Sequence, residues 1–134
     1  MQTHETYLLD TCICIALIKG NATVVEHIRQ VGYTNCKISE ITLAELYFGA
    51  VKSGQQKHFE DVYEIKDLFE QYPISNSLKE YGEIRWQLER TGMKIDHFDT
   101  LIAATALQED LTLVTGNIKH FNRIPGLRIE NWME

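Results

Sequence analysis

Proline is scarce in this chain of 134 residues, with two copies, and no stretch of eighteen apolar residues occurs. A proline-rich linker is therefore absent, and no segment is long and apolar enough to predict a membrane span. Because a chain of this length suits one compact domain, we expect a single domain over residues 1–134. The N-terminal segment lacks a basic stretch followed by an apolar run, so we expect no secretion signal and a cytoplasmic protein.

Cysteine is also scarce, with three copies at Cys12, Cys14 and Cys36. An odd number of cysteines without an export signal favours a reducing compartment over a disulfide framework. No histidine or second cysteine pair follows Cys12 and Cys14 at the spacing of a zinc finger. We expect Cys12 and Cys14 to be small, buried apolar side chains rather than reactive thiols.

Positive charge is in deficit, since 13 Lys and Arg face 19 Asp and Glu and the formal net charge is −6. Most nucleic-acid-binding proteins have a basic surface, so this balance argues against a protein that simply coats phosphates. An enzyme that gathers carboxylates around a cation can nevertheless be acidic and act on a polyanion, because the ion supplies the positive field. An acidic surface also suits a basic partner protein.

Short apolar runs alternate with segments of helical periodicity, which predicts an α/β fold with a mainly parallel, short-stranded sheet flanked by helices. The expected strands cover residues 7–9, 36–38, 73–75, 111–115 and 127–129, the last at an edge. The expected helices cover residues 12–19, 22–31, 40–52 with Ser39 as its cap, 55–71, 77–90, 97–108 and 118–121. The mixed acidic and apolar helix 55–71 suits simple core packing, or a surface for a second copy or a partner protein.

Acidic and amide side chains follow the predicted strands. Asp10 comes directly after strand 7–9, and Asn117 comes just after strand 111–115. Asp96 and Asp99 begin the most apolar helix, and we expect all four at the strand-exit edge of the sheet, where α/β proteins place their sites. Glu45 differs, because it lies among apolar neighbours within a helix and needs a partner there.

Each acidic residue has an ordinary structural explanation when it is considered alone. Asp96 suits a helix N-cap, and Asp99 is favoured by the helix dipole. Asp10 suits a turn, and Glu45 suits an ion pair with a lysine. If Asp10, Glu45 and Asp99 share one pocket, however, two such charges ~4 Å apart repel by roughly 4 kcal/mol at an effective dielectric of about 20. Protonation or a cation relieves that repulsion.

An all-oxygen set of ligands favours a hard ion, Mg²⁺ or Mn²⁺, over zinc. Such ions keep several waters and engage phosphate oxygens, so hydrolysis of a phosphodiester is the chemistry that we expect.

Four motifs in order resemble the PIN-domain ribonucleases, and most closely the VapC-type toxins of bacterial toxin–antitoxin pairs. The first three motifs are YLLDTCICI with Asp10, ISEITLAELYFGA with Glu45, and DHFDTLIAATAL with Asp99. The fourth is LTLVTGNIKHF, which is followed by IPGLRIENW. The resemblance covers nearly the whole chain, and the order of the motifs makes it specific.

The resemblance implies a three-layer PIN-like fold and a Mg²⁺- or Mn²⁺-dependent endoribonuclease in which a metal-activated water attacks RNA. It places the metal ligands and catalytic residues at Asp10, Glu45 and Asp99. It also implies a cognate antitoxin and a homodimer. Many members have a fourth acidic residue where this chain has Asn117. Asn117 adds no negative charge and Asp96 offers a substitute ligand, so we expect one strong metal site.

Further residues near these motifs have candidate roles. The hydroxyls of Thr11 and Thr115 suit either orientation of the carboxylates or ordinary packing. Arg85 is a candidate contact for RNA phosphates, while Lys94 and the other nearby cations are typical of a solvated helix face. His97 suits a general acid or a surface residue.

Three functions remain open from the sequence. The first is the endoribonuclease, and the second is a catalytically weak PIN-like module that binds RNA or protein. The third is a nuclease that uses the same site on DNA or flap structures. Which RNA is cut, and whether one or two ions take part, lies beyond the sequence.

Overall fold

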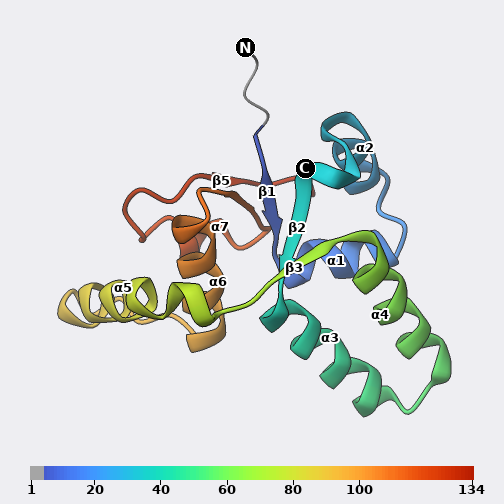
Figure 1. Cartoon of the computed structure of the whole chain (residues 1–134), viewed down its shortest axis with the longest axis horizontal. Helices are drawn as coiled ribbons and strands as arrows, with labels where there is room; N and C mark the ends of the chain where they lie inside the picture. Colours follow the sequence, from blue (N-terminus) through green and yellow to red (C-terminus); the bar gives the residue numbers. More distant parts are fainter. Residues whose placement is uncertain (1–4) are drawn as a thin grey trace.

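Five short strands form one parallel sheet with the order β3-β2-β1-β4-β5 in the computed structural model, which describes residues 5–134 (Figure 1). Residues 1–4 of the predicted domain lie outside the described range. The strands are β1 (Tyr7–Leu9), β2 (Cys36–Ser39), β3 (Glu70–Tyr72), β4 (Thr112–Val114) and β5 (Ile129–Glu130). The parallel sheet that the alternating pattern predicted is thus confirmed.

Helices cover both faces of the sheet and make three layers (Figure 1). One face packs against α1 (Thr11–Ile18), α2 (Ala22–Val31), α3 (Glu40–Ser53) and α4 (Gln56–Leu68). The other face packs against α5 (Leu78–Arg90), α6 (His97–Gln108) and α7 (Ile118–Phe121). The 3-10 turns Tyr33–Asn35 and Ser75–Ser77 precede β2 and α5. This is the predicted PIN-like architecture.

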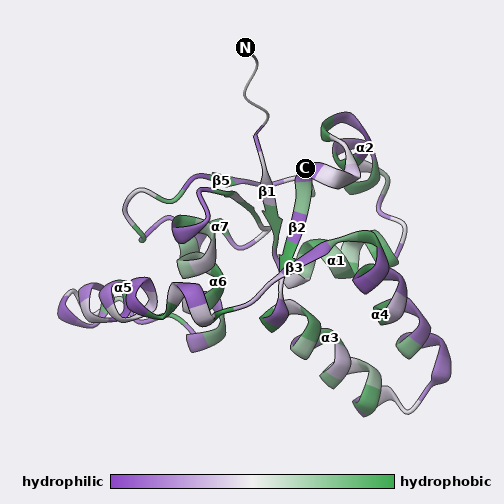
Figure 2. Ribbon diagram, in the orientation of Figure 1, coloured by the Kyte–Doolittle hydropathy of each residue, from purple (hydrophilic) through white to green (hydrophobic). Residues whose placement is uncertain are grey.

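Alternation along β1 divides the core between the two layers. Tyr7 and Leu9 pack with the α1–α4 layer, whereas Leu8 packs with the α5–α7 layer. Every residue of β1 and β4 is buried, as expected for central strands of a parallel sheet that is covered on both faces. Figure 2 shows the hydrophobic colouring on the central strands and the hydrophilic colouring concentrated on α4 and α5.

The predicted strand 73–75 is wrong, and the predicted helix 55–71 is too long. The chain instead leaves α4 at Leu68 and pairs β3 with β2 through Glu70–Tyr72. Pro73 has no N–H to donate to a ladder, which ends the strand. β3 lies at the edge of the sheet, where polar side chains can stay in contact with water. In the sequence these polar residues look like a continuation of the polar face of α4, which is why the predicted helix was too long. The final edge strand is confirmed, although it lies at Ile129–Glu130 rather than 127–129.

Helix caps hold the beginnings of the helices around one end of the sheet. The side chains of Asp10, Ser39 and Asp96 accept hydrogen bonds from the first turns of α1, α3 and α6. α3 ends at Gly54, whose φ of 68° is the left-handed conformation that glycine adopts most easily. The N-terminal ends of these three helices gather near the carboxyl end of β1 (Figure 1).

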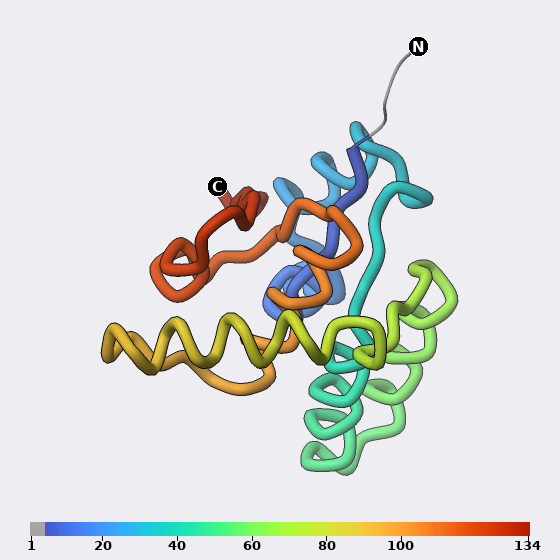
Figure 3. The backbone as a smooth tube through the Cα atoms, turned by 60° about the vertical axis from the view of Figure 1, so that its left-hand side comes forward, coloured from blue at the N-terminus to red at the C-terminus, as the bar shows by residue number. Residues whose placement is uncertain are grey.

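The helix α5 extends away from the sheet and crosses the α6 side of the molecule, as the tube view shows (Figure 3). It returns to α6 through the loop 91–96. Within the part of the chain that the structure describes, no single helix is long and apolar enough to cross a membrane. Only α1 and α2 pass that test together, and a bend of 109° separates them.

Candidate active site

Asp10 lies at the carboxyl end of β1 and is 6% exposed. The backbone N–H of Thr11 donates to its Oδ1 at 2.8 Å. The hydroxyl of Thr115, at the end of β4, donates to its Oδ2 at 2.8 Å. The thiol of Cys12 is a weaker third donor, with Sγ 3.8 Å from Oδ2. These contacts hold the carboxylate in one orientation and tie the ends of two neighbouring strands together.

Glu45 reaches the same region from α3. Thr11 Oγ1 donates to Glu45 Oε1 at 2.6 Å and lies 3.1 Å from Thr42 Oγ1. Thr11 therefore links the beginning of α1 to the first half of α3, because its backbone contacts Asp10 and its side chain contacts Glu45. A hydroxyl contact, rather than the lysine ion pair considered from the sequence, is the partner of this carboxylate.

Asp99 lies in the first turn of α6 and is half-buried. Burial raises the pKa of Asp99 to about 6, and the negative charges of Asp10, Asp96 and Glu45 add to that rise. Burial also raises the pKa of Asp10, which its hydrogen bonds from Thr115, Thr11 and Cys12 partly oppose. Three other carboxylates, Asp10, Asp96 and Glu45, therefore add to the effect of burial in disfavouring the charged form of Asp99.

Basic side chains do not neutralise this acidic group. The ion pairs among residues 5–134 are Lys37–Glu70, Arg85–Glu89 and Arg128–Asp110, and none of them includes these carboxylates. Their uncompensated charge and oxygen donors fit a hard divalent cation. In the described residues, however, no three Asp, Glu, His or Cys side chains are already arranged to hold one ion. A metal site here requires side-chain rotation.

The two residues named as further ligands have other contacts in the structure. Asp96 caps α6, with Oδ2 accepting from the backbone N–H of Phe98 at 3.0 Å, as its position in the sequence predicted. The backbone N–H of Asn117 donates to Thr115 Oγ1 at 2.9 Å, and its side-chain Nδ2 lies 2.8 Å from His120 Nδ1. Asn117 thus supports Thr115, the residue that orients Asp10, and its role as a metal ligand stays a prediction.

Two contacts of this site escaped the sequence prediction. Cys12 is only half-buried, so its interpretation as a buried apolar side chain is wrong, whereas Cys14 is buried as predicted. The thiol of Cys12 contacts Asp10 and Thr115, and the backbone N–H of Gly116 donates to its Sγ. Thr42 was not considered either. The signal for Thr42 was its helical spacing, three residues before Glu45. Cys12 gave only the weaker signal that it lies two residues after Asp10, in the first turn of α1.

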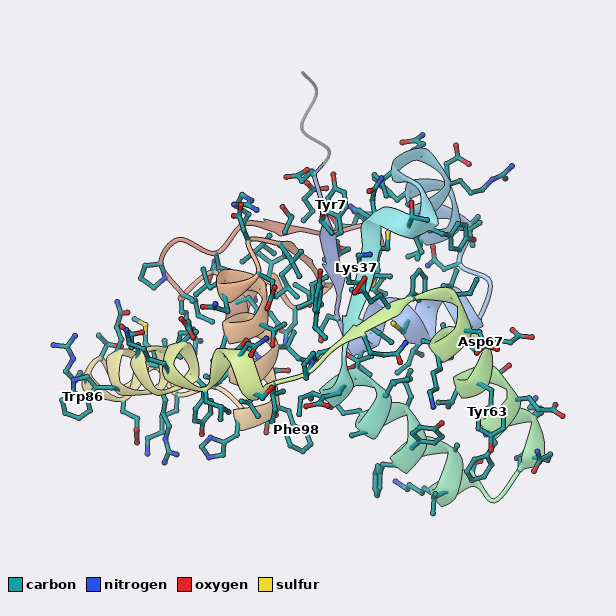
Figure 4. The ribbon with its side chains drawn as sticks, viewed as in Figure 1. Tyr7, Lys37, Tyr63, Asp67, Trp86 and Phe98 are labelled. Carbon is teal, nitrogen blue, oxygen red and sulfur yellow. The ribbon has the colours of Figure 1, made fainter. Side chains whose placement is uncertain are left out.

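Arg85, the candidate contact for RNA, lies on α5 away from the carboxylates. Its Nε is 3.3 Å from Glu89 Oε2, and its Nη1 donates to the hydroxyl of Tyr81 at 3.2 Å. Figure 4 shows Trp86 far out on α5 and Phe98 at the beginning of α6. Arg85 thus contacts Glu89 and Tyr81 of its own helix, and its role in binding RNA stays a prediction.

The sequence matches the PIN domain family over residues 7–127. It is 40% identical over 131 residues to Ribonuclease VapC2 of Rickettsia felis, covering 94% of this chain and 97% of that relative. It is 38% identical over 136 residues to the tRNA(fMet)-specific endonuclease VapC of Salmonella typhimurium, with the same shares covered.

Solved structures agree with these relatives. The chain in the crystal structure of VapBC2 from Rickettsia felis, bound to a DNA fragment from their promoter, matches with a TM-score of 0.89 and 36% identity. That match covers 95% of this chain and 98% of the other. DNA-bound VapBC from Salmonella typhimurium matches with a TM-score of 0.88 and 34% identity, covering 96% and 98%.

Proposed function

Because this chain belongs to the PIN domain family, within the group of VapC ribonucleases, we propose that it is a metal-dependent endoribonuclease. It is the toxin of a toxin–antitoxin pair, and it hydrolyses phosphodiester bonds of RNA. The observation that supports this most directly is the uncompensated carboxylate cluster at the carboxyl end of β1. Repulsion between the carboxylates makes such a cluster unfavourable unless a cation binds. A cation held by carboxylates is also what metal-assisted hydrolysis of a phosphodiester requires.

In this proposal Asp10, Glu45 and Asp99 hold a Mg²⁺ or Mn²⁺ ion. When bound, such an ion activates the attacking water and stabilises the charge that develops on the phosphate. Thr115 and Thr11 position the carboxylates of Asp10 and Glu45 through the hydrogen bonds described above. Asp96 and Asn117 are the candidates for additional ligands.

A groove beside the site suits the antitoxin. It lies between α1, α3 and α4 and has a volume of about 480 Å³. Its wall is partly apolar, through Ile15, Ile18, Leu46 and Val62, and Glu45 stands among its lining residues. We therefore expect an apolar antitoxin segment to lie here and to cover Glu45, which would block access to the carboxylates. The prediction that α4 contributes a partner surface fits this groove.

Assembly and location follow from the same family membership. The relatives of known structure are VapBC complexes, so a cognate antitoxin and a dimeric toxin belong to this proposal. RNA is a cytoplasmic substrate for such a toxin, and we propose that location.

The experiment that tests the proposed function compares substrates. The purified chain is incubated with tRNA, rRNA and mRNA, and with single-stranded and flap DNA of matched length, with Mn²⁺ or after removal of divalent ions. We expect cleavage of RNA alone, and only with the metal. Cleavage of DNA in preference to RNA would favour the DNA nuclease instead, and Mn²⁺-independent binding without cleavage would favour the inactive module.

Replacing Thr115 by Val tests whether the hydroxyl positions Asp10. The change removes the 2.8 Å hydrogen bond to Asp10 Oδ2 at nearly constant volume. We expect Mn²⁺ affinity, measured by calorimetry, to fall about 10- to 100-fold, which is typical when the partner of a metal ligand is lost. Thr115→Ser should restore most of the affinity.

The control for this change is Thr105→Val. Thr105 is also fully buried, but its hydroxyl donates to the carbonyl of Leu101 within α6. Its replacement should leave Mn²⁺ affinity unchanged. Equal losses in both variants would mean that Thr115 acts through general stability rather than through Asp10.

A further inference from the structure

A small pocket opens between α5 and the beginning of α6, on the opposite side of the sheet from the antitoxin groove. Its volume is about 130 Å³. Three of its lining residues have basic side chains, namely Arg85, Lys94 and His97. The rest of its wall is formed by Leu88, Glu89, Ile95 and Thr100. Cationic side chains gathered around a pocket are unusual in a chain whose net charge is −6.

A chain of hydrogen bonds organises the rim of this pocket. Arg85 Nη1 donates to the hydroxyl oxygen of Tyr81 at 3.2 Å, and that oxygen lies 3.1 Å from His97 Nδ1. Because the guanidinium can only donate, the hydroxyl oxygen of Tyr81 accepts from Arg85 and its own proton is free to be donated to His97 Nδ1. In the tautomer that accepts this bond at Nδ1, the N–H of His97 is on Nε2 and is available to an acceptor from outside.

The charges around the pocket are only partly paired. Glu89 accepts from Arg85 Nε at 3.3 Å and is the one carboxylate in the lining. The other N–H groups of the Arg85 guanidinium, on Nη1 and Nη2, do not contact Glu89. Lys94 and His97 are exposed, and neither takes part in an ion pair among residues 5–134. The pocket thus retains net positive charge after Glu89 is counted.

The pocket and the carboxylate cluster both include residues from the first turn of α6. At about 100° per residue, Thr100 lies about 100° and His97 about 160° around the helix from Asp99, so the pocket and Asp99 face different sides of this turn. The helix with its side chains is about 10–12 Å wide, so an RNA strand that reaches Asp99 and bends around this turn brings another of its phosphates to the pocket.

We propose that this pocket is a binding subsite for a backbone phosphate of the RNA substrate, on the strand that carries the phosphate that is cleaved. Arg85 and Lys94 supply the charge, His97 supplies an N–H donor, and Tyr81 positions both Arg85 and His97. The inference rests on the proposed function, since it assumes that RNA lies at the carboxylates. The carboxylates repel the phosphates of RNA, and the protein as a whole is acidic. Positive charge at this pocket would offset that repulsion and hold the RNA beside the carboxylates.

Binding of a labelled single-stranded oligoribonucleotide tests the subsite without interference from cleavage. Anisotropy is measured in an Asp10→Asn background over a series of salt concentrations. Arg85→Gln and Lys94→Gln are each expected to weaken binding about 3- to 10-fold at low salt, and to reduce the slope of log K against log salt by about 0.7. Tyr81→Phe keeps every charge, so it should weaken binding about threefold with an unchanged slope.

The matched control is Lys66→Gln, which removes one exposed positive charge from α4. It should leave both the affinity and the slope unchanged, and melting curves check that each variant is folded. RNA binding that is the same in Arg85→Gln, Lys94→Gln and the control would overturn the subsite. The subsite would also be overturned if Arg85→Gln and Lys94→Gln bound the antitoxin more weakly but bound RNA normally. The pocket would then be a contact for protein.

These failures are distinguishable from failure of the proposed function. If the chain with Asp10 intact cleaves RNA with Mn²⁺ but the pocket variants bind RNA normally, only the subsite is refuted. If it cleaves no RNA at all, the proposed function itself fails. In the cleaving protein, Arg85→Gln should raise KM and leave kcat nearly unchanged, because the subsite lies outside the carboxylate cluster.

Discussion

Replacing Asp10 by Asn is expected to lower RNA cleavage at least about a thousandfold, because a metal ion stabilises the reaction by several kcal/mol and each 1.36 kcal/mol is tenfold in rate. The fold should survive. Asn is nearly isosteric, and its oxygen still accepts from the backbone N–H of Thr11. Its amide can donate to Thr115 Oγ1, which has two acceptor lone pairs. Cleavage is measured with the RNA that the unchanged protein cuts fastest.

Stability gives this variant a second readout. Burial raises the pKa of Asp10, so the charged carboxylate opposes folding at neutral pH when no cation is present. Asp10→Asn should therefore melt at the same temperature as the unchanged protein, or higher, in metal-free buffer. Asp67→Asn is the control, because Asp67 is exposed on α4 and far from the site (Figure 4). Substantial cleavage by Asp10→Asn, or its loss in Asp67→Asn, would contradict the assignment.

Removal of divalent cations is expected to abolish cleavage, and addition of Mn²⁺ should restore it and stabilise the fold. An ion present at 100 times its Kd contributes about 2.7 kcal/mol to the free energy of unfolding. For a chain of this length that corresponds to a rise in Tm of roughly 10 °C. Calorimetry should show one strong site per chain, because Asn117 adds no charge where a further carboxylate would strengthen a second site.

Asp99→Asn separates the metal effect from general stabilisation. The pKa of Asp99, raised to about 6, shows that its charged form is disfavoured beside Asp10, Asp96 and Glu45. Its neutralisation should raise Tm without metal and remove most of the increase that Mn²⁺ produces. A full Mn²⁺-dependent increase in this variant would place the ion elsewhere. Asp67→Asn, at an exposed position on α4, should respond to Mn²⁺ like the unchanged protein.

Much of the fold was predictable from apolar periodicity. α2, α6 and α7 have the predicted bounds, and β1 does as well, because each is a clear apolar pattern ended by strong signals. The failure at β3 has a physical cause. Glu70–Tyr72 is a strand because its backbone pairs with β2, and not because its side chains are buried. Its polar side chains resemble the polar face of the preceding helix α4, so apolar periodicity could not reveal the strand.

The site was predictable as a set of residues but not as a geometry. Strand ends and motif order singled out Asp10, Asp99 and Glu45, and the pKa of Asp99 is raised by burial and by the charges of the other two. The hydrogen bonds of Thr11 to Glu45 and of Thr115 to Asp10 join residues more than thirty positions apart. No local pattern encodes such pairs, since they depend on how α1, α3 and β4 meet. Metal binding by these residues stays a prediction.

The two edges of the sheet bear on how the protein behaves at high concentration. β3 has three residues and β5 has two, and both include a glutamate. Glu70 pairs with Lys37 on the neighbouring strand at 2.9 Å, and Pro73 follows directly after β3. Short edges with charge, and a proline beside one of them, offer a poor template for strand pairing between copies. The sheet itself should therefore resist edge-to-edge aggregation, which leaves association to helical surfaces.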